Sequence, residues 1–170
     1  MRWSAAWAAV ALGWLAVTPA AAVDPDEVMR PCRRTDILGV WRVIRLGVPA
    51  GADVDRTDPA FLPHQRYVFH SDATMAHVTQ DVPFTGEDQR SLSRLPRPAT
   101  WALETEGRLV RQRDGVAAVE EMQCRVMLRD VKDPRTSQPT AQPGDVLLTD
   151  EPGEGRLPTR RLLRRIGAAE

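Results

Sequence analysis

The sequence predicts an all-β protein: a single antiparallel up-and-down β-barrel of about eight strands, preceded by an N-terminal signal peptide. Two observations and one physical argument support this fold class. Short segments rich in β-branched and aromatic residues alternate with Gly-, Pro- and Asp-rich turns along residues 37–166. No segment after the leader shows a sustained helical period of apolar residues. Closing the strands into a barrel also removes the exposed edges that an open sheet would leave.

The leader has the pattern of a secretory signal peptide. Arg2 provides a positive charge, residues 3–18 are almost entirely apolar, and Pro19 precedes a run of alanines ending at Ala22. We therefore expect residues 1–22 to be a signal peptide cleaved after Ala22, which predicts a periplasmic or secreted protein. The alternative is an uncleaved anchor, because residues 3–23 carry no charge and are long enough to cross a bilayer. Membrane contact is expected only in that case.

After the leader we expect an arm at residues 23–36, the barrel at residues 37–166 and a tail at residues 167–170. Two cysteines remain, Cys32 in the arm and Cys124 in the barrel. In an exported protein an even pair is most simply a disulfide, which would join the arm to the barrel wall. The alternative is two separate thiols, one of them buried.

The expected strands are separated by turn residues or by longer loops. The loops are expected at residues 47–63, 82–99 and 133–144, which are rich in polar residues, Gly and Pro. Tight turns are expected at Ser71-Asp72-Ala73 and at Glu106-Gly107. The strands are expected at residues 37–46, 65–70, 74–79, 101–105, 109–113, 116–131, 145–149 and 158–166.

The first strand, DILGVWRVIR, places Ile37, Trp41 and Val43 on one face, with Gly39 between them. The longest strand, residues 116–131, also has one apolar face, and Glu120 is its exception. A carboxylate at such a position predicts either an arginine partner inside the barrel or an irregularity in the strand.

Several of these segments together resemble the lipocalin-like (calycin) barrels. They are "LGVW" on the first strand, "YVFHSDATM", "TWALETEGRLV" and a last strand with basic residues. The first hairpin has Asp72-Ala73 where that group has Asp-Gly. The resemblance implies that Trp41, two positions after Gly39, closes one end of the barrel. It also implies that a basic side chain from near the last strand packs across this tryptophan. The candidates are Arg160, Arg161, Arg164 and Arg165, with Arg164 and Arg165 expected to be structural.

Composition and motifs exclude several function classes. The formal net charge is +0, with 23 basic and 23 acidic residues, whereas nucleic-acid-binding proteins usually carry a basic excess. The chain lacks G-x-S-x-G, H-E-x-x-H, C-x-x-C and a Gly-rich phosphate loop. His70, Ser71 and Asp72 are consecutive, whereas a catalytic triad needs residues that converge from separate elements. We therefore expect a protein that is not an enzyme and has no cofactor.

Two functions fit an exported barrel. The first is binding of a small apolar ligand in a cavity lined by Trp41, Tyr67, Phe69, Trp101 and Leu103. The second is an accessory subunit that docks on a periplasmic or envelope protein complex. Docking predicts a filled interior and contacts through the loops at residues 47–63 and 82–99. Interior volume discriminates between the two functions.

A third hypothesis is copper binding through sulfur and imidazole. Met75 and His77 project to the same strand face, with His70 across the hairpin, and Met122 shares a face with Cys124. Methionine is also a common core filler, and the predicted disulfide uses Cys124. We therefore expect no metal site.

Overall fold

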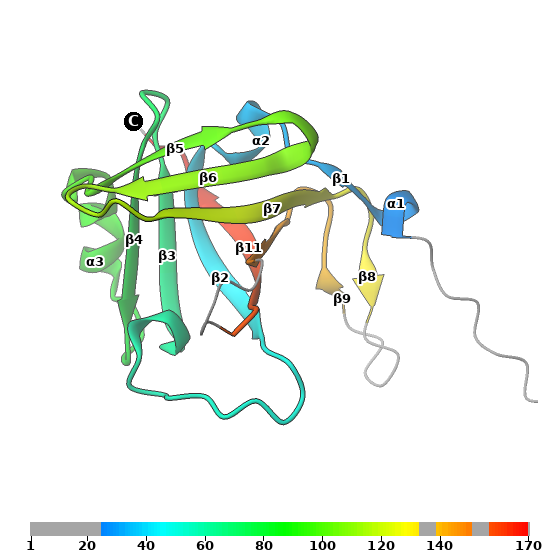
Figure 1. The fold of residues 1–170 in the computed structure, drawn as a ribbon, viewed down its shortest axis with the longest axis horizontal. Helices are drawn as coiled ribbons and strands as arrows, with labels where there is room; N and C mark the ends of the chain where they lie inside the picture. The colour runs from blue at the N-terminus through cyan, green and yellow to red at the C-terminus, as the bar shows by residue number, and fades with distance from the viewer. Residues whose placement is uncertain (1–24, 133–138, 151–156, 170) are drawn as a thin grey trace, which may run out of the picture.

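The computed structural model describes residues 25–132, 139–150 and 157–169. Within these residues, eight antiparallel strands close into a barrel, and each strand pairs with the next barrel strand along the chain (Figure 1). The predicted all-β barrel is therefore confirmed, while the predicted signal peptide lies outside the described residues. The barrel strands are β2 (Gly39–Gly47), β3 (His64–Phe69), β4 (Thr74–Gln80), β5 (Ala99–Leu103), β6 (Arg108–Arg113), β7 (Val119–Met127), β10 (Val146–Asp150) and β11 (Arg160–Gly167).

The remaining elements are short. They are the strands β1 (Met29–Pro31), β8 (Val131–Lys132) and β9 (Pro139–Ala141), the helices α1 (Pro25–Val28), α2 (Arg34–Ile37) and α3 (Gly86–Ser91), and the 3-10 turns η1 (Pro59–Phe61), η2 (Leu92–Arg94) and η3 (Thr105–Gly107). β1 pairs with β7 along the barrel wall, and β8 pairs with β9. None of the helices in the described ranges has the length and hydropathy needed to span a membrane.

Several expected boundaries are corrected. Ile37 belongs to α2 and not to the first strand. The strand predicted at residues 116–131 is shorter, because β7 ends at Met127 and Leu128 is exposed. The segment at residues 133–144, expected to be a loop, contains β9.

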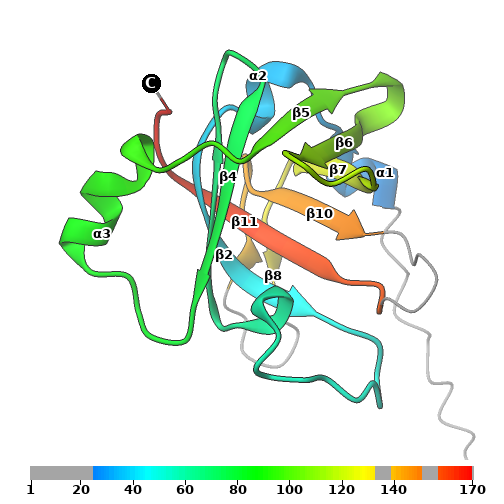
Figure 2. The ribbon, with the colours of Figure 1, turned by 60° about the vertical axis from the view of Figure 1, so that its left-hand side comes forward.

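The segment at residues 82–99, expected to be irregular, contains α3 and η2. Thr85 caps α3, because its hydroxyl accepts a hydrogen bond from the Asp88 backbone and the Asp88 carboxylate accepts one from the Thr85 backbone. Leu92 of η2 is then buried with Val68 and Ala76, residues of β3 and β4. The segment thus lies beside β4 and covers part of the outside of the barrel (Figure 2).

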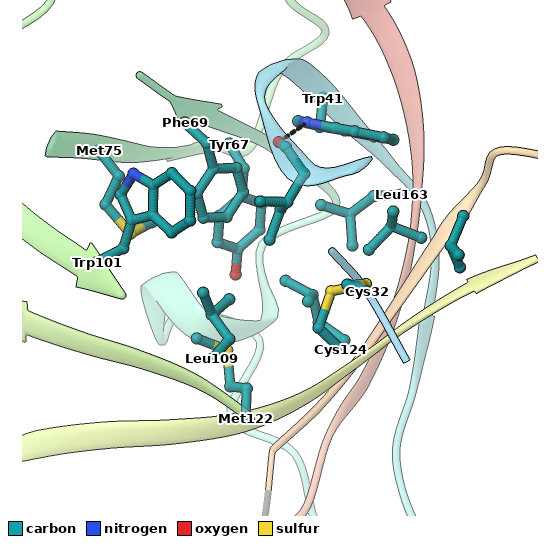
Figure 3. Close-up of a cluster of buried hydrophobic side chains, with 14 of the residues drawn as sticks. Cys32, Trp41, Tyr67, Phe69, Met75, Trp101, Leu109, Met122, Cys124 and Leu163 are labelled. Atoms are coloured by element: carbon teal, nitrogen blue, oxygen red, sulfur yellow. Dashed lines mark hydrogen bonds between the residues drawn. A yellow bond between two sulfur atoms is a disulfide. The ribbon is translucent and has the colours of Figure 1, made fainter. Parts of the chain in front are cut away.

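The arm covers one end of the barrel and is fixed there by a disulfide. Cys32 and Cys124 form the predicted bond, with 5.4 Å between their Cα atoms, so this prediction is confirmed. Both sulfurs lie in the main core beside Leu109 and Met122 (Figure 3). The bond therefore joins the arm to the interior of the barrel.

Gly39 is required where β2 leaves the arm. Its φ is +124°, a conformation that side chains rarely adopt, and a Cβ there would lie 2.8 Å from the backbone oxygen of Gly167. The absence of a side chain at Gly39 lets the first and last strands of the barrel, β2 and β11, approach at this point.

Candidate functional site

The interior of the barrel is divided into two layers. In the first, which we call the apolar layer, inward-facing residues pack around the disulfide; they include Trp41, Phe69, Met75, Trp101, Leu109, Met122, Leu148 and Leu163. In the second, which we call the polar layer, six of the described strands each contribute a polar side chain. The polar layer consists of Gln65, His77, Arg111, Glu120, Asp150 and Arg161.

The division follows from the two-residue period of the strands. Met75 and His77 are two positions apart on β4, and so are Leu109 and Arg111 on β6, so each pair faces the same side of its strand. The lumen-facing residues therefore change from apolar to polar along each of these strands. We call the polar end the mouth of the barrel, because α2 closes the other end.

Arg161 organises one half of the polar layer. Its side chain is 6% exposed and forms an ion pair with Asp150, whose side chain is 28% exposed. Its Nε donates a hydrogen bond of 3.3 Å to Gln65 Oε1, and one terminal nitrogen donates to the backbone oxygen of Ala60. Thr159 also contacts both members of the ion pair. The loop turn η1 therefore lies against the mouth.

Gln65 determines which ring nitrogen of His77 carries the proton. Its Nε2 donates to the backbone oxygens of Ala60 and Leu62 at 3.0 and 2.9 Å, so its Oε1 faces the lumen as an acceptor. His77 Nε2 lies 3.2 Å from that oxygen and must be the donor. The imidazole of His77 also stacks on Tyr67, with 4.0 Å between the ring centroids.

The other half of the polar layer is built on Arg111. A terminal nitrogen of Arg111 contacts Glu120 Oε2, and Arg113 lies 3.4 Å from Glu120 Oε1. An arginine partner for Glu120 inside the barrel is one of the two expectations raised by its place on an apolar face. The Arg111 side chain is 8% exposed, and its Nε is buried with no hydrogen-bond partner among the described residues.

The electrostatics of the layer favour neutral forms of the two rings. Burial, followed by the guanidiniums of Arg111, Arg161 and Arg113, holds the pKa of His77 well below its usual value. Burial also raises the pKa of the Tyr67 phenol, against the opposing effect of Arg161 and Arg111. Both rings are therefore uncharged at neutral pH and lie between guanidinium groups.

The structure places the five residues predicted to line a ligand cavity as follows. Trp41, Tyr67, Phe69 and Trp101 are buried in the core, and Leu103 packs against it. Phe69 contacts Trp101 edge to face, with 5.5 Å between the centroids, and Tyr67 stacks on Phe69 at 5.9 Å (Figure 3). These side chains fill the apolar layer with one another. Contact between any of them and a ligand stays a prediction.

The residues expected to be structural lie at the closed end. Arg165 covers the indole of Trp41 beside Gly39, whereas Arg164 forms an ion pair with buried Asp145 at 2.7 Å. Of the other two candidates, Arg161 points into the polar layer and Arg160 is exposed.

The side chains considered for copper are used in other contacts. Cys124 belongs to the disulfide, Met75 and Met122 are in the core, and His77 stacks on Tyr67. In the described part of the chain no group of three or more His, Cys, Asp and Glu side chains could hold a metal ion.

Two surface clefts lie away from the polar layer. One, of about 380 Å³, is at the closed end and is lined by Asp36, Asp145, Arg164 and Arg165 among others. The other, of about 420 Å³, lies between α3 and the end of β11. Neither is lined by any of the five residues predicted to contact a ligand.

Comparison of the chain with protein-family models, with the curated proteins and with the solved structures found no match. The candidate site is therefore inferred from its geometry. Sequence reasoning named Tyr67 as a ligand contact, His77 only in the copper hypothesis and Glu120 as a carboxylate on an apolar face. It did not identify Gln65, Arg111 or Asp150 as interior residues. The signal available for Arg111 was its place two positions after Leu109 on a strand.

Proposed function

We propose that the chain is an exported, non-enzymatic, lipocalin-like binding protein that takes a small ligand at the mouth of its barrel. The observation that carries this proposal is the division of the interior. The aromatic side chains of the apolar layer are packed against one another, whereas the polar layer contains hydrogen-bonding groups and partly exposed carboxylates at the lumen end. A few convergent polar groups above an apolar floor are typical of ligand sites.

In this proposal Tyr67 is the floor of the site. It is buried, it belongs to the core, and its ring is stacked between Phe69 and His77. A ligand at the mouth would contact the polar layer first, and the deeper aromatic residues would support Tyr67 from below. An apolar ligand within the apolar layer would require these residues to separate.

The proposal can be tested with two classes of small molecule. A panel of polar metabolites and a neutral apolar probe, N-phenyl-1-naphthylamine, would be titrated against the chain from Val23 onward. The proposal predicts that a polar compound raises the melting temperature and that Arg161→Gln abolishes this effect. Binding of the apolar probe alone, unaffected by Arg161→Gln, would refute the mouth as the site.

A docking role on an envelope complex is the second candidate. The observation that favours it is the filled apolar layer, together with the exposure of most residues from Val48 to Asp58 between β2 and β3. Replacing residues 51–57 by a Gly-Ser segment would abolish co-purification with such a complex while the melting temperature is kept. Unchanged co-purification would remove this loop from the interface.

We also propose that the protein is exported. Cleavage after Ala22 predicts a secreted form whose intact mass begins at Val23. The disulfide supports an oxidising compartment, where such bonds persist. Recovery of the full-length chain in the membrane fraction would instead indicate an uncleaved anchor.

A further inference from the structure

The two ion pairs of the polar layer have the same arrangement relative to solvent. The guanidiniums are on the inside, with Arg111 and Arg161 side chains 8% and 6% exposed. The carboxylates are nearer the solvent, with Glu120 and Asp150 side chains 24% and 28% exposed. The positive groups are therefore fixed in the lumen, while the negative groups lie where they can turn toward water.

Arg111 has hydrogen-bonding capacity that the protein leaves unused. A guanidinium carries five N–H donors, arranged to hold an oxyanion through two parallel bonds. Arg111 contacts Glu120 through one terminal nitrogen, and its Nε is buried without a partner among the described residues. A buried donor without an acceptor costs free energy, which an additional oxygen at this position would recover.

Positive groups outnumber negative groups around Arg111. His77 and Tyr67 are uncharged, and the guanidiniums of Arg111, Arg161 and Arg113 all act on the His77 ring. Arg113 adds a third, more exposed guanidinium, with its side chain 56% exposed, that shares Glu120 with Arg111. Three guanidiniums thus lie near a lumen end that holds two carboxylates, Glu120 and Asp150, which leaves an excess of one positive charge.

We propose that the ligand of this mouth is a small oxyanion, a carboxylate or phosphate, which displaces the Glu120 carboxylate from Arg111 and Arg113. This inference rests on the proposed function, because it assigns a ligand class to the same site. In the structure Glu120 stands in for the ligand: it supplies one oxygen to each arginine and occupies their shared position. A free oxyanion would offer two oxygens to Arg111 and leave Glu120 to turn into water.

The displacement has a direct consequence for mutants of Glu120. Glu120→Gln removes the competing charge with little change in shape, so it should bind acetate and phosphate about tenfold or more tightly than the wild type. Glu121→Gln is the matched control, because Glu121 is the next residue, carries the same charge and pairs with exposed Arg108 on the outside of the barrel. Its affinity for the anions should equal that of the wild type.

The substitution of Arg111 has a matched control as well. Arg111→Gln should abolish anion binding, whereas Arg108→Gln, on the same strand but with its side chain 45% exposed, should retain it. Binding would be measured by calorimetry with acetate and inorganic phosphate at constant ionic strength, and acetamide would serve as the neutral analogue of acetate. Acetate and phosphate together distinguish the two oxyanion classes.

The inference is overturned if Glu120→Gln and Glu121→Gln bind the anions equally, or if acetamide binds as well as acetate. If Glu120→Gln does not fold, titration of the wild type with acetate, followed by the NMR signals of His77 and Tyr67, takes its place. Unmoved signals would overturn the inference. Binding of a neutral polar metabolite that Arg161→Gln abolishes, with both anions inert, would refute the oxyanion while leaving the proposed function intact.

Discussion

The guanidinium of Arg165 covers the indole of Trp41, with its Cζ 4.8 Å from the ring centroid. A terminal nitrogen of Arg165 also donates a hydrogen bond of 2.6 Å to the backbone oxygen of Asp36. The indole Nε1 donates one of 2.7 Å to the backbone oxygen of Ile37. Both side chains therefore bind the carbonyl end of α2, and together they hold this helix across the closed end of the barrel.

Replacing Trp41 should destabilise the whole fold and not only affect a binding site. Its side chain is 0% exposed, so Trp41→Ala should lower the free energy of unfolding by about 3–5 kcal/mol, as large aromatic deletions in cores do. Urea unfolding followed by circular dichroism would measure the loss. A variant that melts within a degree or two of the wild type would show that Trp41 does not close the barrel.

Arg165 should be the arginine that couples to Trp41. A double-mutant cycle between Trp41→Ala and Arg165→Ala should give a coupling free energy of about 0.5–2 kcal/mol, the range for an arginine over an indole. Arg160→Ala is the control, because Arg160 is exposed and should show no coupling. Arg164→Ala should destabilise the protein through buried Asp145 without coupling to Trp41. Equal coupling for Arg160 and Arg165 would refute the assignment.

The disulfide should contribute strongly to stability because it closes a long loop. Cys32 and Cys124 are 92 positions apart, and removing such a bond typically costs about 2–5 kcal/mol. The double substitution to serine should therefore lower the unfolding midpoint sharply. Thiol labelling of the unfolded, unreduced protein should detect no free sulfhydryl in the secreted form. Two labels per chain would show that the exported protein does not form this bond.

His77 should make the fold sensitive to mild acid. Its pKa is lowered in the native state by burial and by neighbouring guanidiniums, so the unfolded chain binds a proton that the native chain does not. The free energy of unfolding should therefore fall as the pH drops from about 6.5 to 5, by at most about 1.4 kcal/mol per pH unit. His77→Phe keeps a ring beside Tyr67 and should flatten this part of the curve. If His77→Phe leaves the slope unchanged, the native fold does not lower the pKa of His77.

The barrel could be predicted from the sequence because its strands are short, alternating and separated by turn residues. Trp41 and Cys124 are apolar groups on faces whose period was visible, and their burial followed from that period. The helix α3 was not predicted, because it is too short to show an apolar period. It forms because Thr85 and Asp88 cap it and because Leu92 buries against the outside of the barrel.

The polar layer was largely missed for a different reason. Gln65, Arg111 and Asp150 are residue types that usually face solvent, and nothing local in the sequence shows that they face the lumen. Their position depends on which strands meet at one level, which only the register of the closed barrel determines. Glu120 was the exception, because the long apolar face of its strand made a carboxylate conspicuous.

Binding of a ligand at the mouth, above the packed apolar layer, can be tested directly by NMR. The chain from Val23 onward would be titrated with the polar metabolite panel while the ring signals of His77, Tyr67 and Trp41 are followed. A compound that binds at the mouth should shift the signals of His77 and Tyr67 and leave the signal of the Trp41 indole unchanged. A ligand that shifts Trp41 and Trp101 while His77 is unmoved, or a panel in which no compound moves any of these signals, would contradict binding at the mouth.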